Sequence, residues 1–159
     1  MEKLQRPIIS FKIKQIIPTG KEERSKAIIE AIMLIELKHS KKELWCETDY
    51  FLENKQPLQD PEKYVGLTAT AELDLVESVL KTTKGNPKKN IQNTVERKIY
   101  YGINGKIVEI KSFDQAQYAL VDCGLEVPIL VNIPKQKFKA EENLYAEGWF
   151  WLRMLKLKK

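Results

Sequence analysis

The sequence predicts a mainly β protein made of two small antiparallel β-barrel units in tandem. Apolar and polar residues alternate along several segments, which is the pattern of strands with one buried face. Both halves also show the same order of strand, hairpin, polar connection and strand. A basic segment with almost no apolar residue separates the halves. We therefore place an N-terminal β-rich unit at residues 1–80, a basic linker at 81–96 and a C-terminal unit at 97–159.

The first half contains three segments with a strand pattern. In Ile8–Ile17, apolar residues alternate with serine and lysine, and Pro18 to Gly20 ends the run. Leu34–Lys38 and Glu43–Leu52 are spaced as a hairpin around a polar turn. Val65–Val76 is the most regular, because every second residue from Leu67 to Leu75 is apolar. These segments predict an antiparallel sheet.

One segment of the first half leaves two alternatives open. Residues 21–38 are rich in Glu, Lys, Ala, Ile and Leu, all compatible with a helix. Thr19 and Glu22 have the spacing of a capping box, which would start such a helix near Gly20. A helix near residues 21–37 would make the N-terminal unit α+β, whereas a strand there would leave it all β.

The second half begins with a long strand and continues with a hairpin. Ile99–Lys111 contains two glycines, which mark a bend or bulge within a strand. Gln117–Asp122 and Glu126–Ile133 are joined by a short connection in which Gly124 can adopt a positive φ. A lysine-rich connection leads to Leu144–Leu157, a last strand rich in aromatic residues.

The strand pattern of the C-terminal unit resembles that of OB-fold barrels, mainly over residues 97–157. The resemblance rests on the segments Gly105–Ile110, Tyr118–Gly124, Val127–Val131 and Glu147–Trp151. OB-fold barrels bind oligonucleotides or oligosaccharides across one strand face. The resemblance therefore implies a small barrel with a binding face, although fold alone does not decide function.

The net charge of +5 is concentrated in one short segment, since residues 81–98 hold six basic residues and one acidic residue. In the last strand, alternation places two indoles and an arginine on one face. Such a face can stack the bases of a single strand while nearby basic groups contact phosphates. The residues predicted to bind nucleic acid in this way are Trp149, Trp151, Arg153, Lys156, Tyr100, Lys88, Lys89, Arg97 and Lys98.

The leading functional prediction is therefore a non-enzymatic protein that binds single-stranded DNA or RNA. The alternative is a protein-interaction or assembly module, in which Trp149 and Trp151 form an interface with another part of the chain, a protein partner or a second copy. The same features also have purely structural interpretations. Trp149 and Trp151 would then form an aromatic core, and residues 81–96 a solvated basic linker.

Other functional classes have little support in the sequence. No nucleophile motif or phosphate-binding glycine loop is present, and we expect no enzyme and no cofactor. Two cysteines, Cys46 and Cys123, and the single histidine His39 are too few for a zinc site, so we expect no metal and two buried thiols. Glu72 and Asp74 are interpreted as an exposed polar strand face. Without a long apolar run or a signal peptide, the expected location is the cytoplasm, not a membrane.

Overall fold

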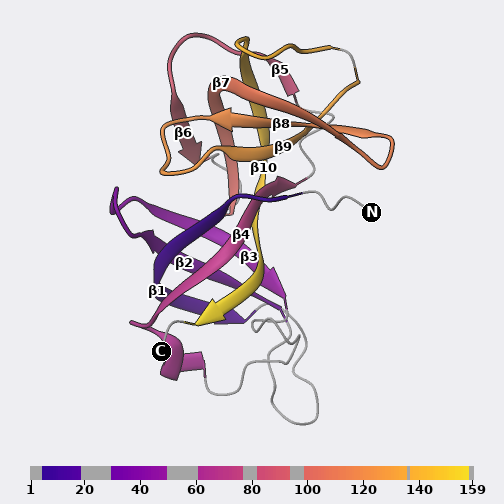
Figure 1. Ribbon diagram of the computed structural model, residues 1–159. Helices are drawn as coiled ribbons and strands as arrows, with labels where there is room; N and C mark the ends of the chain where they lie inside the picture. Colours follow the sequence, from indigo (N-terminus) through magenta and orange to yellow (C-terminus); the bar gives the residue numbers. More distant parts are fainter. Residues whose placement is uncertain are drawn as a thin grey trace. The chain divides into compact units, whose positions relative to one another are not determined.

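The computed structural model describes residues 5–18, 30–49, 61–76, 82–93, 99–135 and 137–157 (Figure 1). These residues form ten strands and one short 3-10 helix, which confirms the mainly β prediction. The strands are β1 (Ile8–Pro18), β2 (Glu30–Leu37), β3 (Glu43–Asp49), β4 (Thr68–Val76), β5 (Thr82–Lys84), β6 (Asn90–Asn93), β7 (Tyr100–Phe113), β8 (Ala116–Asp122), β9 (Ile129–Ile133) and β10 (Asn143–Leu157), and the helix is η1 (Pro61–Tyr64).

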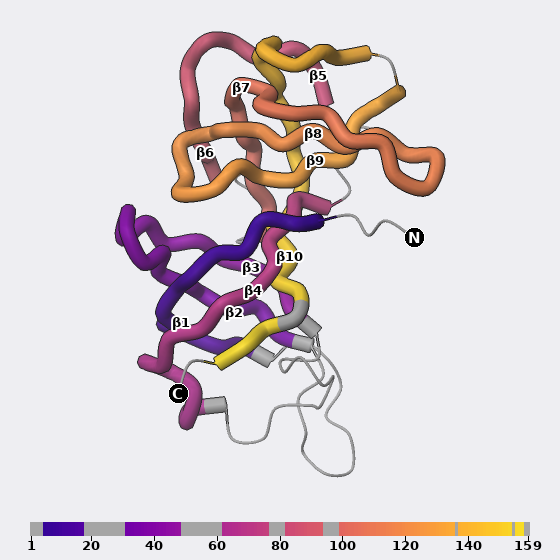
Figure 2. Tube along the Cα trace, in the orientation of Figure 1, coloured from indigo at the N-terminus to yellow at the C-terminus, as the bar shows by residue number. Residues whose placement is uncertain are grey.

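The chain divides into two compact units, and each unit contains two separate segments of sequence. Unit 1 consists of Met1–Pro7 and Leu73–Phe150, and unit 2 of Ile8–Glu72 and Trp151–Lys159. The two boundaries at 72/73 and 150/151 fall inside β4 and inside β10. Both strands can be followed along the chain trace in Figure 2, β4 in magenta and β10 in yellow. Each of these strands therefore supplies residues to both units.

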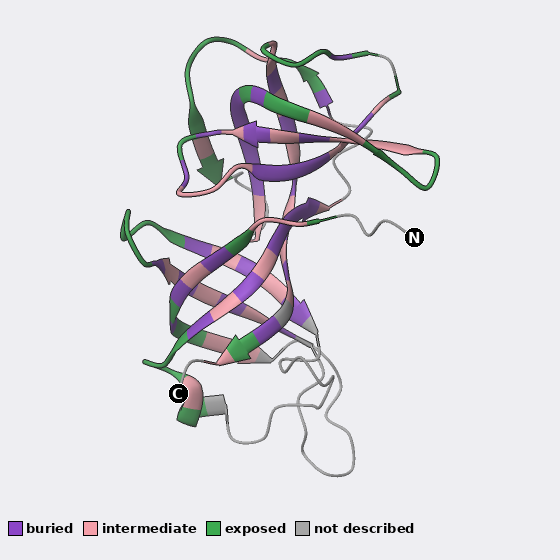
Figure 3. Ribbon diagram, viewed as in Figure 1, coloured by how far each residue is buried: buried purple, intermediate pink, exposed green. Residues whose placement is uncertain are grey.

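Unit 2 is built on antiparallel pairing of β2 with both of its sequence neighbours, β1 and β3. The strand order is β10-β3-β2-β1-β4, and β10 also pairs with β4, so the strands close into a barrel. Along β1, Ile9, Phe11 and Ile13 are buried, while the residues between them face outward, as the alternation predicts (Figure 3). A β-bulge between Ile13 and Gln15 then shifts the register.

The helix considered for residues 21–37 is not formed in the part that the structure describes. Residues 30–37 are strand β2, and residues 19–29 lie outside the described residues. Ala31, Met33, Ile35 and Leu37 are all buried, which is a period of two and not of 3.6. Pairing on both edges with β1 and β3 explains why the helix-compatible composition of this segment is overridden.

Unit 1 is centred on β7, which pairs with β6, β8 and β10. The predicted long first strand is confirmed, and its irregularity, a shift of the β7–β8 register between Ile107 and Glu109, lies beyond the two glycines that were expected to mark it. The predicted hairpin of β8 and β9 is also confirmed, and Gly124 in its connection has a φ of 98°. β9 then pairs in parallel with the last residues of β4. Tyr101 and Phe150 pack in the core with ring centroids 5.1 Å apart.

The segment predicted as a basic linker, residues 81–96, contains two short strands where it is described. β5 pairs with β10 and β6 pairs with β7. Between these strands, the buried Asn104 amide holds the chain: its Oδ1 accepts from the Asn86 N–H at 3.0 Å, and its Nδ2 donates to the Asn86 carbonyl at 2.7 Å. Because the buried Asn104 side chain hydrogen-bonds to the backbone of this loop, it fixes a segment that has few apolar residues of its own.

The exposed acidic face predicted for Glu72 and Asp74 is wrong at Asp74. This residue is only 7% exposed, and its Oδ2 accepts a hydrogen bond from Arg6 Nε at 3.0 Å. A buried carboxylate requires a charged or hydrogen-bonding partner. The partner lies 68 residues away in sequence, so alternation within β4 could not indicate it.

Asp122, at the end of β8, gives unit 1 a pH-dependent contact. Its Oδ2 accepts a hydrogen bond from Lys89 Nζ at 2.7 Å, and this bond is the main reason that the pKa of Asp122 lies below its usual range. Because the folded pKa is lower than the unfolded value of about 3.9, the contact stabilises the fold above that value. This contribution is lost as the pH falls through the folded pKa.

We expect Asp122→Asn to lower the free energy of unfolding at neutral pH by about 1 kcal/mol or less, because this pair is solvent-exposed. The difference in the free energy of unfolding between this variant and the unmodified chain should vanish as the pH falls below the pKa of Asp122 in the folded state. Urea unfolding at a series of pH values measures this. A difference that stays constant down to the lowest pH would contradict the expectation.

Candidate anion-binding site

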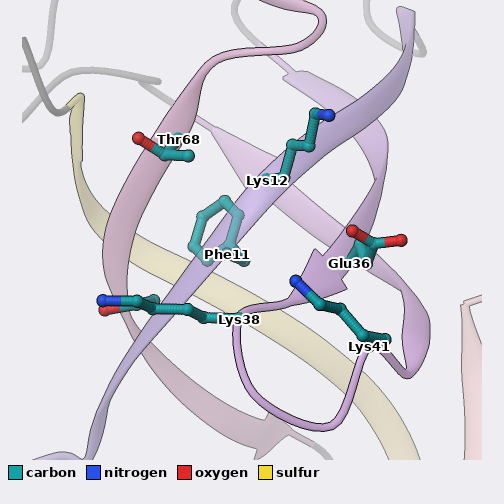
Figure 4. A pocket seen from close by; sticks show the side chains of 7 residues that line it. Phe11, Lys12, Glu36, Lys38, Lys41 and Thr68 are labelled. Atoms are coloured by element: carbon teal, nitrogen blue, oxygen red, sulfur yellow. The ribbon is translucent and has the colours of Figure 1, made fainter.

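A pocket of about 380 Å³ lies on unit 2, on the strands β1, β2 and β4 and the turn that follows β2. Figure 4 shows its side chains as sticks. The lining residues are Ser10, Phe11, Lys12, Glu36, Lys38, Lys41 and Thr68. All seven belong to the same unit, so the site is complete within it.

The strand register brings the polar side chains of the pocket together. Lys12 of β1 is opposite Glu36 of β2 and also opposite Thr68 of β4. One row of side chains therefore crosses three strands, because directly opposite residues point to the same face of a sheet. The neighbouring residue Ser10 accepts, through its backbone carbonyl, a hydrogen bond from the Lys38 N–H at 3.1 Å. Lys38 thus enters the turn next to this row.

The turn between β2 and β3 positions Lys41 at the pocket. The Leu37 N–H donates to the Lys42 carbonyl at 2.9 Å, and the Lys41 N–H donates to the Leu37 carbonyl at 3.1 Å. The Ser40 hydroxyl accepts from the Lys42 N–H at 3.2 Å. Lys41 itself has a φ of 62°, the left-handed conformation that allows such a tight reversal. In Figure 4 its side chain reaches from the turn toward β1.

The pocket has an excess of positive charge. Three lysines and one glutamate line it, together with Ser10 and Thr68. The Glu36 carboxylate also lies 4.0 Å from Lys14 Nζ, at the edge of the same outer face. Ammonium and hydroxyl groups are hydrogen-bond donors, so the lining suits a ligand rich in negatively charged acceptor oxygens.

The predicted nucleic-acid-binding residues are divided between the two units. Trp149 belongs to unit 1, whereas Trp151 and Arg153 belong to unit 2. All three are half-buried, and the Arg153 guanidinium lies over the Trp151 ring, 5.3 Å from its centroid. Lys156, also in unit 2, is exposed. At the alternate positions of β10, Phe150 and Leu152 are fully buried.

The other predicted residues lie in or near the segment 81–98. Lys89 is bound to Asp122, Lys88 is exposed, and Tyr100 is half-buried at the start of β7. Arg97 and Lys98 lie outside the described residues.

The lysines of the pocket were visible in the sequence only as the polar side of a strand pattern. Lys12 alternates with buried residues on β1, and Lys38 and Lys41 flank a turn, both of which are usual places for solvated lysines. Their common location depends on register across β1, β2 and β4, which no local pattern indicates.

Cys46 and Cys123 are buried, as predicted, and burial raises the pKa of the Cys46 thiol well above its usual range. Among the described residues, no group of three or more His, Cys, Asp or Glu side chains could hold a metal ion. No helix in the described part of the chain is long and apolar enough to cross a membrane.

No protein-family model matches the sequence, and no curated protein matches it. Among solved structures, the fold matches that of a protein described as the cytoplasmic molybdate-binding protein ModG, in a crystal form with molybdate bound. The TM-score is 0.52 at 10% sequence identity, and the match covers 99% of this chain and 100% of that chain.

The comparison contradicts the predicted binding of single-stranded DNA or RNA. The neighbour that matches over the whole chain is described as binding molybdate, which is a small oxyanion and not a nucleic acid. At 10% identity the likeness shows the fold and does not transfer a ligand. This chain therefore shares its β-barrel fold with a protein that binds a small anion.

Proposed function

We propose that this protein binds a small oxyanion in the pocket of unit 2, without catalysing a reaction on it. The observation that carries the proposal is the grouping of Lys12, Lys38 and Lys41 around one pocket with a single carboxylate, Glu36. Three lysines that line one pocket with a single carboxylate raise the local positive potential, which attracts an anion. Binding of an anion is therefore favourable at this site.

The lining residues supply complementary hydrogen-bond chemistry. An ammonium group has three donors and no acceptor, and its hydrogen bonds to an anionic oxygen are about twice as strong as neutral ones. Ser10 and Thr68 also line the pocket, and a hydroxyl group that rotates toward a ligand oxygen can donate to it. Buried Phe11 lies beneath them and gives one side of the pocket a fixed wall.

The dimensions of the pocket also support a small ligand. One water occupies about 30 Å³ in the liquid, so a pocket of about 380 Å³ holds on the order of ten waters. A tetrahedral oxyanion fits in this volume together with several bridging waters, which carry hydrogen bonds almost as well as direct contacts. The fold shared with a protein described as binding molybdate is a second, independent support. The OB-like character of the barrel, expected from residues 97–157, remains part of this proposal.

Replacement of the pocket lysines tests the proposal. We expect Lys12→Gln, Lys38→Gln and Lys41→Gln together to weaken oxyanion binding at least about 100-fold, since each charged hydrogen bond contributes roughly 1.5–3 kcal/mol. Isothermal titration with sodium phosphate, sodium sulfate and sodium molybdate, each at low ionic strength, measures the dissociation constants.

A matched control variant removes the same charge elsewhere. Lys84, Lys88 and Lys135 are exposed and belong to unit 1, so their joint replacement by Gln should leave binding unchanged. The proposal fails if the unmodified protein binds none of the three anions. It fails equally if the pocket variant and the control variant bind them alike.

A further inference from the structure

The Glu36 carboxylate lines the proposed anion pocket together with its three lysines. It is directly opposite Lys12 in the β1–β2 register, and its side chain is 24% exposed. A carboxylate does not assist the binding of an anion by charge alone, because like charges repel at short distance. Its presence in the pocket lining therefore places a condition on the ligand.

An ionised carboxylate only accepts hydrogen bonds. Near neutral pH, sulfate and molybdate have no proton, so every oxygen that they present to Glu36 is another acceptor. Inorganic phosphate and arsenate still carry at least one O–H group at that pH. Such a group donates a short, charge-assisted hydrogen bond to a carboxylate oxygen.

We infer that Glu36 makes this pocket selective for oxyanions that carry an acidic O–H group, the class of phosphate and arsenate, over fully deprotonated oxyanions. The inference rests on the proposed function, because it concerns the same site. With a fully deprotonated oxyanion, the Glu36 carboxylate faces a ligand oxygen without a hydrogen bond. The free-energy cost of such an unpaired acceptor is larger than the gain from a correct hydrogen bond. The protein then binds molybdate more weakly than phosphate or arsenate.

Lys14 lies beside Glu36. Its ammonium lies 4.0 Å from Glu36 Oε1, on the strand β1 that also carries Lys12. Because a carboxylate has two oxygens and several acceptor positions, contact with Lys14 at one oxygen is compatible with a ligand hydrogen bond at the other. The contact with Lys14 therefore leaves acceptor capacity on Glu36 for a ligand.

The experiment compares dissociation constants for sodium phosphate and sodium sulfate near neutral pH, with sodium molybdate as a third probe. We expect the unmodified protein to bind phosphate at least about tenfold more tightly than sulfate. In Glu36→Gln the ratio should fall to about one, mainly through tighter sulfate binding, because an amide donates to a deprotonated oxygen. Glu36→Asp, which keeps the carboxylate, should keep a preference for phosphate.

Glu62→Gln is the matched control, since Glu62 is exposed on η1 of the same unit and the charge change is identical. It should leave the phosphate-to-sulfate ratio unchanged. If anions bind through the pocket lysines but Glu36→Gln does not alter the ratio, the selectivity inference is overturned and the proposed function stands. If the unmodified protein binds none of the anions, both are overturned.

Discussion

A chain that ends at Phe150 is expected to lose the folded structure of unit 2. The removed residues include the last part of β10, where Leu152 and Leu155 are fully or almost fully buried. The Thr48 hydroxyl also donates a hydrogen bond to the Leu152 carbonyl at 3.2 Å. Truncating one buried leucine to alanine already costs about 2–5 kcal/mol. Loss of the whole segment is therefore comparable to the total stability of a small domain, about 5–15 kcal/mol.

Removal of this segment also opens the barrel. β10 pairs with β3 and with β4, so unit 2 without residues 151–157 has lost the strand that closes its ring. The strand edges exposed in this way present unpaired N–H and C=O groups and favour aggregation. Near-ultraviolet circular dichroism and limited proteolysis of the 1–150 chain measure the loss.

A chain of residues 1–157 is the matched control, because it lacks only the two residues after β10. It should unfold at the same denaturant concentration as the full chain. Cooperative unfolding of the 1–150 chain at the midpoint of the control would show that unit 2 does not need the end of β10, and would contradict this expectation.

The second large effect is expected at Gly105, in the middle of β7. A Cβ atom there would lie 2.2 Å from the backbone carbonyl oxygen of Asp122 and 2.9 Å from the Cα atom of Cys123. These are backbone atoms of the paired strand β8 and its connection, so a rotamer change cannot relieve the overlap. We expect Gly105→Ala to lower the free energy of unfolding by about 2–3 kcal/mol. Denaturant unfolding measures the change.

Gly102 on the same strand is the matched control. A Cβ atom at Gly102 would approach Tyr145 chiefly through its hydroxyl oxygen, at 2.5 Å, and that is the far end of a side chain that can rotate away. Gly102→Ala should therefore cost less than Gly105→Ala. Equal losses for the two variants would show that loss of glycine in the strand, and not backbone overlap, determines the effect.

The local strand pattern was readable from the sequence because alternation and turn residues act over a few positions. Ile9, Phe11 and Ile13 on β1 predicted one buried face, and Gly124 predicted the reversal between β8 and β9. Long-range pairing leaves no such trace. The partition of β4 and β10 between two cores, and the partner of Asp74 at Arg6, depend on contacts between residues far apart in sequence.

The candidate site was less predictable than the fold for the same physical reason. Trp149 and Trp151 are conspicuous because they are large aromatic residues at alternate positions of one strand, and the structure leaves both half-buried on β10. Lys12 and Lys41 are unremarkable residues taken singly, and only the register and the turn geometry make them neighbours. A site built from such common residues can therefore be found only in the three-dimensional structure.

The division of β4 also bears on how the molecule opens. Ala71 is buried with unit 2 and Leu73 with unit 1, so consecutive inward-facing positions of one strand are anchored in different cores. Local unfolding of either core therefore ends inside a strand and not in a loop. We therefore expect thermal opening of either hydrophobic cluster to destabilise the half of β4 that belongs to the other, because one backbone runs through both.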